Sequence, residues 1–520
     1  MTIFNSFPTS LSLTNAQRAA VYALQEFILS SDSQVFILRG YAGTGKTTLM
    51  EGVIQYLRSE ERTVLAMAPT GRAARILSNK TGAKARTIHS IVYKQSSVEL
   101  KSESLKRKFV INPSSPADAT ILIADEVSML SDVYEGDDEA SFGTGRILSD
   151  LLTFVNLAEN PNTKLIFIGD DAQLLPVKSN VSPALSTSYL RREFGLTVEE
   201  ATLTQVMRHD NAILDAATKV REDLSDRNFE NIIPTPRGEV SVVKHGDLVA
   251  TFLSENPNVT DAHDSVMIVA SNEKAFEYNM TVRNRFFPLG DGTPMVGDRL
   301  MVCANMYGLD QALMNGEIVE VCAIGEQVTR RHTLQSNRFE WEQFQDAKVK
   351  PAEIEFEGFD RAKVTLRFRK MQVRLFGGAR LDIVVLNDFL FSSQTDLSPL
   401  VRRALMVDLR ERVTRDNPGE SKAMLDAKFL AAVDGDIYLN AVPVKFAYAI
   451  TCHKAQGGEW KRVYANICTK PDRAKTAEYF RWVYTAMTRA SQFLILGAPY
   501  VPNGRDKSRL VPKPNYRFQR

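Results

Sequence analysis

Short, largely apolar runs alternate with amphipathic segments through the first 200 residues of the chain. Runs of this length are typical of strands buried on both faces, and they cover residues 35–38, 64–67, 121–124 and 164–168. Residues 48–57 instead repeat their apolar positions at helical spacing. Each run ends in a polar segment, as in sheets that carry function at the carboxyl ends of parallel strands. The pattern predicts a parallel α/β sheet.

A second α/β pattern starts near Ala201. Residues 266–270 read as a buried strand, and residues 445–452 and 493–497 are interpreted as later strands of the same sheet. Between them, residues 291–440 have a different character. We interpret that stretch as a β-rich module inserted into the second α/β domain.

The inserted stretch contains one clear strand signature, at residues 361–376. Val364, Leu366 and Phe368 share one face, whereas the opposite face is basic, with Arg361, Lys363, Arg367 and Arg369. Strict alternation of this kind predicts a strand with a basic outer face. A helical stretch is expected to follow at about residues 397–433.

These patterns divide the chain into three parts. The first domain is expected over residues 1–200, the second over 201–290 and 441–520, and the insertion over 291–440. Inside the first domain, the polar residues 93–117 are too many for a tight turn, so an excursion with its own hairpin is expected there.

Composition narrows the function classes only a little. The 520 residues exceed what one hydrophobic core holds, and the net charge of +2 gives no argument for nucleic acid, so a basic groove would have to be local. Without an apolar run of 18 residues, a secretory signal at residues 1–13 or a CxxC pair among the four cysteines, we expect a cytoplasmic protein with no membrane span and no zinc or redox site.

Residues 40–47 fit the phosphate-loop pattern G-x-x-x-x-G-K-[ST], with Gly40, Gly45, Lys46 and Thr47 at the specified positions. Glycines let the backbone N–H groups approach phosphate oxygens, and the helix that follows offers its N-terminal dipole to the same anion. Lys46 is expected to reach the β and γ phosphates, and the Thr47 hydroxyl to ligate magnesium. The alternative is a glycine-rich turn that binds nothing.

An acidic pair, Asp125-Glu126, follows the apolar run 121–124. An aspartate at a strand end can hold a metal ion, and the adjacent glutamate can orient and deprotonate the attacking water. Elsewhere such a pair is usually a solvated turn. After a buried strand, in a chain with a phosphate loop, it predicts the second half of a magnesium–phosphate site.

Further segments extend this pattern along the whole chain. They lie at residues 13–17, 68–74, 87–90, 125–129, 169–170, 173–177, 203–208, 451–459 and 483–490. In order and spacing the set resembles the motifs of superfamily 1 DNA helicases, in the RecD-like and Dda-like branch. The resemblance implies an α/β fold of two tandem RecA-like P-loop motor domains. It also implies a β-hairpin pin as the excursion of the first domain and an SH3-like β-rich insertion in the second.

The resemblance implies ATP and Mg²⁺ as ligands of the cleft between the two domains. The implied nucleotide contacts are Gln17, Gly40, Gly43, Thr44, Gly45, Lys46, Thr47, Thr48, Gly458 and Glu459. The implied catalytic residues are Lys46, Glu126, Gln173, Arg208 and Arg489, and the implied metal ligands are Thr47 and Asp125. A glutamine near a helix start is also a common capping residue, and an isolated arginine is often a surface ion-pair residue, so both alternatives stay open.

The resemblance also implies residues that contact the DNA backbone. They are Pro69, Thr70, Arg72, Thr87, His89, Phe109, Thr451, His453 and Lys454. Hydroxyls and backbone amides of such loops can bind phosphates without reading sequence. The two histidines have an alternative interpretation as structural residues.

The hairpin and the insertion carry two further hypotheses. In the excursion 93–117, Leu100 or Phe109 is expected to stack on the first broken base pair while the basic residues Lys101, Lys106, Arg107 and Lys108 face phosphates; a solvated loop is the alternative. The basic face from residue 361 to 380 either lines the exit of the strand or is simply a solvated β face. Residues 297–300 and 315–317 fit the SH3-like pattern, whereas 326–440 are longer than the compact version of that subdomain.

The function implied is an ATP-dependent 5′-to-3′ DNA helicase that works as a monomer on single-stranded DNA and on junctions with duplex, with replication or repair proteins as possible partners. The direction follows from the resemblance alone. The alternatives are an RNA helicase of the same superfamily, a translocase that strips proteins from single strands, and a small-molecule kinase or GTPase that uses the same loop.

Overall fold

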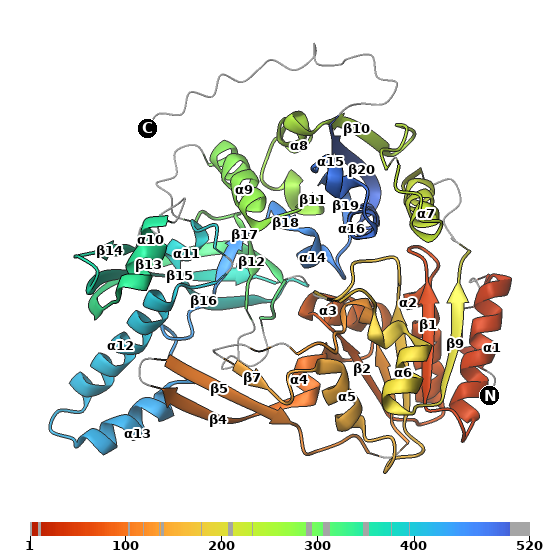
Figure 1. Cartoon of the computed structure of the whole chain (residues 1–520), viewed down its shortest axis with the longest axis horizontal. Helices are drawn as coiled ribbons and strands as arrows, with labels where there is room; N and C mark the ends of the chain where they lie inside the picture. The colour runs from red at the N-terminus through yellow and green to blue at the C-terminus, as the bar shows by residue number, and fades with distance from the viewer. Residues whose placement is uncertain are drawn as a thin grey trace.

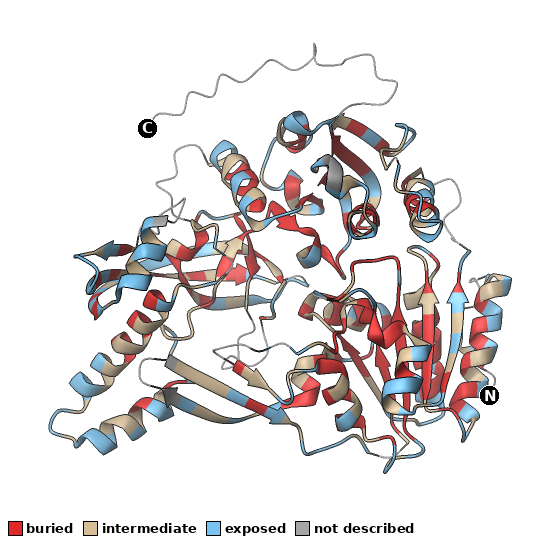
Figure 2. Ribbon diagram, in the orientation of Figure 1, coloured by how far each residue is buried: buried red, intermediate tan, exposed pale blue. Residues whose placement is uncertain are grey.

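The chain builds an α/β structure around two parallel sheets, and Figure 1 presents its computed structural model. The structure describes residues 3–8, 12–101, 104–117, 119–134, 136, 140–177, 179–205, 212–230, 232–287, 294–304, 313–346, 353–375, 377–394 and 396–499. Buried residues concentrate on the strands of both parallel sheets and on the helix faces against them (Figure 2).

The first parallel sheet has six strands in the order β3-β2-β6-β8-β1-β9. Their bounds are β1 Val35–Gly40, β2 Val64–Ala68, β3 Ala85–Thr87, β6 Ile121–Ala124, β8 Lys164–Gly169 and β9 Val198–Leu203. One face packs against α1 (Asn15–Leu29), α2 (Lys46–Ser59) and α3 (Gly71–Thr81). The other packs against α4 (Ile88–Val92), α5 (Ile147–Val155) and α6 (Thr187–Phe194). The predicted parallel α/β sheet is confirmed.

The second parallel sheet has five strands in the order β10-β20-β19-β11-β18. Their bounds are β10 Val240–Lys244, β11 Ser265–Val269, β18 Ala449–Thr451, β19 Trp460–Asn466 and β20 Ala490–Ala498. On one side lie α7 (Ala212–Ser225) and α16 (Ala477–Met487), and on the other α8 (Leu248–Glu255) and α9 (Asn272–Phe286). Two short helices, α14 (Cys452–Ala455) and α15 (Pro471–Ala474), complete this part. We call the part up to Leu203 the first half and the part built on this sheet the second half.

A third, antiparallel sheet occupies most of the predicted insertion, in the order β14-β15-β13-β12-β17 with β16 against β15. Its strands are β12 Arg299–Val302, β13 Ile318–Gln335, β14 Ile354–Phe356, β15 Arg361–Arg374, β16 Arg380–Leu386 and β17 Val444–Phe446. Its helices are α10 Arg338–Asp346, α11 Asn387–Leu390, α12 Pro399–Asp416 and α13 Lys422–Ala432. The predicted alternation is confirmed, because Val364, Leu366 and Phe368 are fully buried.

Two predicted boundaries need correction. Strand β9 pairs with β1 through Leu203, so the first sheet continues past residue 200. The predicted strand 445–452 is in fact two strands, because β17 pairs with β12 in the third sheet whereas β18 pairs with β11 in the second. A continuous apolar run shows that a segment is buried but not which sheet it joins.

The excursion after α4 is a hairpin of β4 (Tyr93–Lys101) and β5 (Ser104–Ile111), and a third strand, β7 (Ala140–Phe142), pairs with β5. The hairpin extends from the first sheet toward α13 (Figure 1). Arg107 Nη2 donates a hydrogen bond to Asn440 Oδ1 at 3.0 Å, and Gln95 Nε2 donates to Asp434 Oδ2 at 2.9 Å. The hairpin is therefore held against the segment that follows α13. Strand β7 was not predicted.

Among the residues that the structure describes, no helix combines the length and the apolar character needed to cross a membrane.

Candidate nucleotide cleft and nucleic-acid contacts

The phosphate loop joins β1 to α2 and has the backbone shape that its glycines permit. Gly43 and Gly45 have φ angles of 77° and 81°, in the left-handed region that glycine adopts without strain. A Cβ added to Gly45 would lie 2.7 Å from Gln17 Nε2, so a side chain here would displace the Gln17 amide group. The loop opens directly into α2, whose first residue is Lys46.

Lys46 folds back over the loop. Its Nζ donates hydrogen bonds to the carbonyl oxygens of Gly40 at 2.7 Å and Tyr41 at 3.1 Å. Thr44 is fully buried and donates its hydroxyl to the same Tyr41 oxygen at 2.8 Å. The ammonium group is therefore positioned inside the curve of the loop, where a phosphate group would meet it.

The acidic pair stands at the carboxyl end of β6, beside the loop. Glu126 donates its backbone N–H to Asp125 Oδ1 at 2.8 Å and has a φ angle of 55°, which is uncommon for a residue other than glycine. Burial, and after it the charge of Glu126, raises the pKa of Asp125 to about 7. A half-buried carboxylate with a raised pKa suits a divalent cation, whose charge would favour the ionised form.

One cleft brings together most of the residues that the sequence assigned to the nucleotide. It is lined by Gln17, Gly43, Gly45, Lys46, Thr47, Thr48, Asp125, Glu126, Gln173, Gly458, Glu459 and Arg489. Gly40 and Thr44 lie behind this lining. Because the last three lining residues belong to the second half, the cleft has one wall from each half.

Gln173 is 2% exposed, and its Oε1 has no hydrogen-bond partner among the described residues. A buried acceptor without a partner is costly. In this cleft it is available to a water molecule or a ligand hydroxyl. The resemblance implied that Gln173 is a catalytic residue, and an acceptor without a partner beside the phosphate loop is compatible with that role.

The sequence left two roles open for Gln17, a helix cap and a contact with the nucleotide. Its Oε1 accepts a hydrogen bond from Thr14 N at 2.9 Å, which completes a capping box at the start of α1. Its Nε2 donates to Thr44 O at 2.9 Å and so ties α1 to the phosphate loop. The side chain also lines the cleft. The capping interpretation is therefore confirmed, and contact with a base stays a prediction.

Arg489 reaches the cleft from the turn after α16. It is 5% exposed, and its guanidinium donates hydrogen bonds to Thr485 O at 3.1 Å and Thr488 Oγ1 at 3.0 Å. It is thus a buried cation anchored in the second half and not a surface ion-pair residue. Arg208, its predicted counterpart, lies outside the described residues.

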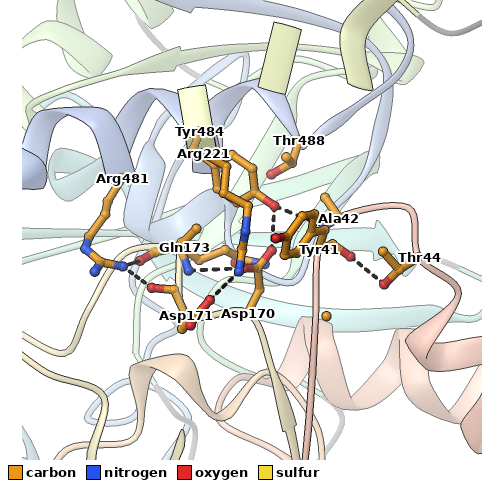
Figure 3. A network of polar contacts seen from close by, with 12 residues as sticks. Tyr41, Ala42, Thr44, Asp170, Asp171, Gln173, Arg221, Arg481, Tyr484 and Thr488 are labelled. Atoms are coloured by element: carbon orange, nitrogen blue, oxygen red, sulfur yellow. Dashed lines mark hydrogen bonds and ion pairs between the residues drawn. The ribbon is translucent and has the colours of Figure 1, made fainter. Parts of the chain in front are cut away.

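A polar network that the sequence did not reveal joins the halves beside the phosphate loop (Figure 3). Arg221, on α7, forms ion pairs with Asp170 and Asp171, which follow β8. Tyr484, on α16, donates its hydroxyl to Asp170 Oδ2 at 2.6 Å and accepts the N–H of Ala42 at 3.0 Å. Nothing in the sequence around Arg221 distinguishes it from an exposed residue of an amphipathic helix.

Two predicted backbone-binding threonines are helix caps at one edge of the first sheet. Thr70 Oγ1 accepts the N–H of Ala73 at the start of α3, and Thr87 Oγ1 accepts the N–H of Ser90 at the start of α4, both at 3.2 Å. Ala68 pairs with Thr87 across the parallel strands β2 and β3, so both helices start at the same edge, with Pro69 between β2 and Thr70. Contact with DNA phosphates at this edge stays a prediction.

The residues of the later motif lie at the end of β18. Thr451 and Lys454 line a small pocket between α9 and β17, and Lys454 Nζ contacts Cys303 Sγ at 3.8 Å. His453 is exposed, although partial burial of its ring lowers its pKa. Thr451 is buried, and contact of the three residues with DNA stays a prediction.

His89 packs against aromatic rings. Its ring centroid lies 5.7 Å from that of Tyr93 and 5.5 Å from that of Phe142. Burial lowers the pKa of His89 to about 4, so the ring is neutral at physiological pH and offers no charge to a phosphate. These contacts favour the structural interpretation of this histidine.

Arg72, a predicted DNA contact, stacks on an aromatic ring of the second half. Its guanidinium carbon lies 3.8 Å from the centroid of the Trp460 ring in the second half. Burial, and then the charges of Arg299 and Arg489, lowers the pKa of Arg72 to about 9. Stacking on an aromatic face is a common use of arginine. Arg72 therefore contacts the second half across the cleft, and its contact with DNA stays a prediction.

The prediction that Phe109 stacks on a base is also wrong. Phe109 is 7% exposed and stacks on Phe142 of β7, with ring centroids 4.6 Å apart and planes inclined by 13°. It sits at the base of the hairpin, in the core that covers one face of the first sheet. The sequence did not reveal β7, and without that strand Phe109 seemed free to face solvent.

Phe109→Ala is expected to lower the free energy of unfolding by about 3–5 kcal/mol, because it leaves a cavity in this core. Denaturant unfolding followed by circular dichroism measures the loss. Phe359→Ala is the matched control, since Phe359 is 59% exposed and its loss should change stability by no more than about 0.5 kcal/mol. Wild-type stability combined with a specific loss of unwinding would restore the stacking role.

The basic face of β15 is largely neutralised. The ion pairs on it are Lys363–Glu357 at 2.5 Å, Arg367–Asp388 at 2.6 Å, Lys370–Glu326 at 2.9 Å and Arg374–Glu320 at 2.7 Å. Of the two hypotheses for this face, a solvated surface with local ion pairs fits better than the exit of a strand.

Comparison with known proteins agrees with the motifs at both ends of the chain. The family model of the AAA domain matches residues 12–134, and that of the UvrD-like helicase C-terminal domain matches residues 446–496. The ATP-dependent DNA helicase dda of Enterobacteria phage T4 is 28% identical over 279 residues, which are 53% of this chain and 57% of that protein. The ATP-dependent RecD2 DNA helicase of Deinococcus radiodurans is 30% identical over 35% of this chain and 21% of that protein.

The chain thus spans little more than half of the phage relative and about a fifth of the RecD2 relative. Among solved structures, a Pif1 helicase from Candida albicans aligns over 94% of both chains at 16% identity, with a TM-score of 0.44. In its family models and these sequence relatives, the chain is similar to superfamily 1 helicases of the Dda and RecD type.

Proposed function

We propose that the protein is an ATP-dependent DNA helicase that moves 5′-to-3′ on single-stranded DNA and unwinds duplex. One observation carries this proposal. The phosphate loop and the acidic pair form one wall of a cleft whose other wall, with Arg489, comes from a second parallel sheet. A nucleotide bound there would contact both halves, so its hydrolysis would change how they fit together.

In this proposal the two sheets are RecA-like motor domains, the β4–β5 hairpin is the pin that separates the strands, and the antiparallel sheet is the SH3-like insertion. The hairpin's hydrogen bonds to Asn440 and Asp434 support a rigid wedge. Single-stranded DNA and its junctions with duplex are the proposed ligands, bound by a monomer at the helix starts after β2, β3 and β18.

Each cleft residue has a distinct task in hydrolysis. Glu126 takes a proton from the water that attacks the γ-phosphorus, and the bond to the β–γ bridging oxygen breaks to give ADP and phosphate. Lys46 and Arg489 stabilise the charge that spreads over the transferring group. Gln173 holds the water with its free Oε1. Thr47 and Asp125 would hold Mg²⁺, which neutralises charge on the β and γ phosphates when bound.

The test compares ATP hydrolysis and strand separation on matched substrates. ATPase rates are measured without nucleic acid, with single-stranded DNA and with RNA of the same sequence. Unwinding is then measured on duplexes with a 5′ tail, a 3′ tail or blunt ends. We expect stimulation by DNA above RNA and unwinding of the 5′-tailed duplex. Unwinding that requires a 3′ tail would overturn the direction, and hydrolysis insensitive to nucleic acid would overturn the function.

A further inference from the structure

Asp170 is a buried carboxylate at the carboxyl end of β8 that receives contacts from both halves. Its side chain is fully buried. Ala172 N of its own turn donates to Oδ1 at 3.1 Å, the Tyr484 hydroxyl donates to Oδ2 at 2.6 Å, and Arg221 forms an ion pair with it. A buried charge of this kind is stable only while its partners stay in place.

One ion pair and two hydrogen bonds form a chain of contacts, and each of them joins a residue of one half to a residue of the other. Arg221 of the second half pairs with Asp170 of the first, Asp170 binds Tyr484 of the second, and Tyr484 binds the Ala42 N–H of the phosphate loop (Figure 3). Each contact therefore joins the halves within the same small region. Burial, and then the charge of Asp170, raises the pKa of Tyr484 well above its usual value, so its hydroxyl keeps the proton that it donates.

Arg221 contacts Asp170, Asp171 and the ring of Tyr41. Its side chain is 12% exposed, and it also pairs with Asp171, at 2.5 Å. Its guanidinium carbon lies 3.7 Å from the centroid of the Tyr41 ring. The backbone oxygen of Tyr41 is one of the two acceptors that hold Lys46. Arg221 thus touches the loop through a ring and the carboxylates through a fork of N–H groups.

The same turn carries a residue of the cleft. Gln173 N donates to Asp170 O at 3.2 Å, and Arg481 of α16 donates to the carbonyl oxygens of Asp171 and Gln173. The backbone of Gln173 is therefore held by a hydrogen bond to Asp170 on one side and by one from Arg481 of the second half on the other. A shift of Asp170 would move the backbone of Gln173 and, with it, the side-chain amide.

We propose that Arg221 is a positioning residue for ATP hydrolysis, because it fixes Asp170 between Tyr484 and the phosphate loop and so sets the orientation of Gln173. This inference rests on the proposed ATPase function. Arg221 is not among the residues that line the nucleotide cleft. It acts on turnover through the relative placement of the loop and the turn after β8.

The primary test is the ATP dependence of hydrolysis with saturating oligothymidylate. Arg221→Gln is expected to lower kcat by about 10-fold to 100-fold, the scale of a misplaced catalytic group, and to change KM for ATP by less than about threefold. Arg221→Lys keeps the charge but lacks the planar guanidinium that pairs with both carboxylates and stacks on Tyr41, so an intermediate kcat is expected. Lys219→Gln is the matched control on the same helix, since Lys219 pairs only with Asp223 of α7 among the contacts described for it.

Thermal unfolding of each variant separates positioning from folding. A lower melting temperature with kcat within twofold of wild type, measured where the variant is folded, would overturn the proposal. If Arg221→Gln does not fold, Arg221→Lys and Tyr484→Phe carry the same test. A wild-type chain without DNA-stimulated hydrolysis would instead refute the proposed function, whatever the variants do.

A double-mutant cycle tests the path through Tyr484. Tyr484→Phe removes the hydroxyl between Asp170 and Ala42 and leaves the ring. If Arg221 acts through this chain, the double variant Arg221→Gln/Tyr484→Phe hydrolyses ATP no more slowly than the slower single variant. If the two losses in kcat multiply, the residues act independently and the proposed path is wrong.

Discussion

Lys46→Ala is expected to lower kcat for ATP hydrolysis by about 10²–10³-fold, the effect of removing one charge-stabilising group from a transition state. In this structure the ammonium group is held by the carbonyl oxygens of Gly40 and Tyr41, inside the curve of the phosphate loop. Alanine removes that charge and leaves the backbone amides of the loop. Affinity for single-stranded DNA should change by less than about threefold, because the predicted DNA contacts lie outside the nucleotide cleft.

ATPase assays and fluorescence anisotropy with a labelled oligonucleotide measure the two quantities on the same preparation. Lys84→Ala is a suitable control, because Lys84 is an exposed lysine of the first half outside the cleft. A Lys46→Ala variant that kept kcat within about threefold of wild type would show that the loop does not hold the transferring phosphate.

Sequence pattern predicted the two parallel sheets well because their strands are buried on both faces. The run 121–124 coincides with β6, and 164–168 differs from β8 by one residue. The pairing of the strands was harder to predict, because the apolar character of a strand does not indicate which neighbouring strand it pairs with. Residues 445–452 looked like one strand, yet β17 and β18 join different sheets. Strand β7 is only three residues long and carries no periodic signal.

The residues of the candidate site likewise fall into two groups, those that the sequence predicted and those that it did not. Motif residues of the cleft were predictable because glycines, a lysine and an acidic pair follow predicted strands directly. Arg221 was not predictable, because its two carboxylate partners lie 51 and 50 positions earlier and meet it only in three dimensions. Phe109 was misplaced for a related reason, because β7, which the sequence did not reveal, covers it. The stacking of Arg72 on Trp460 was not predictable either, because the two residues lie far apart in the sequence.

Glu126→Gln is expected to lower kcat by about 10²–10⁴-fold, the contribution of a general base, while ATP affinity changes by less than about threefold. Glutamine has the same size as glutamate and is no more strained at the φ angle of 55°. The loss of kcat therefore reports on proton transfer. Nucleotide binding is measured with a fluorescent ATP analogue, and turnover with a coupled assay. Near-normal hydrolysis by this variant would assign the proton to another group.

Asp125→Asn separates the base from the metal ligand. Both carboxylates stand at the end of β6 and line the same cleft, so loss of turnover alone cannot distinguish them. If Asp125 holds Mg²⁺, its amide variant should need about tenfold more Mg²⁺ for half-maximal hydrolysis, the scale of a weakened metal site. Glu126→Gln should leave that concentration unchanged. A shifted Mg²⁺ requirement in Glu126→Gln would exchange the two roles, because a general base takes up a proton whereas a ligand binds the cation.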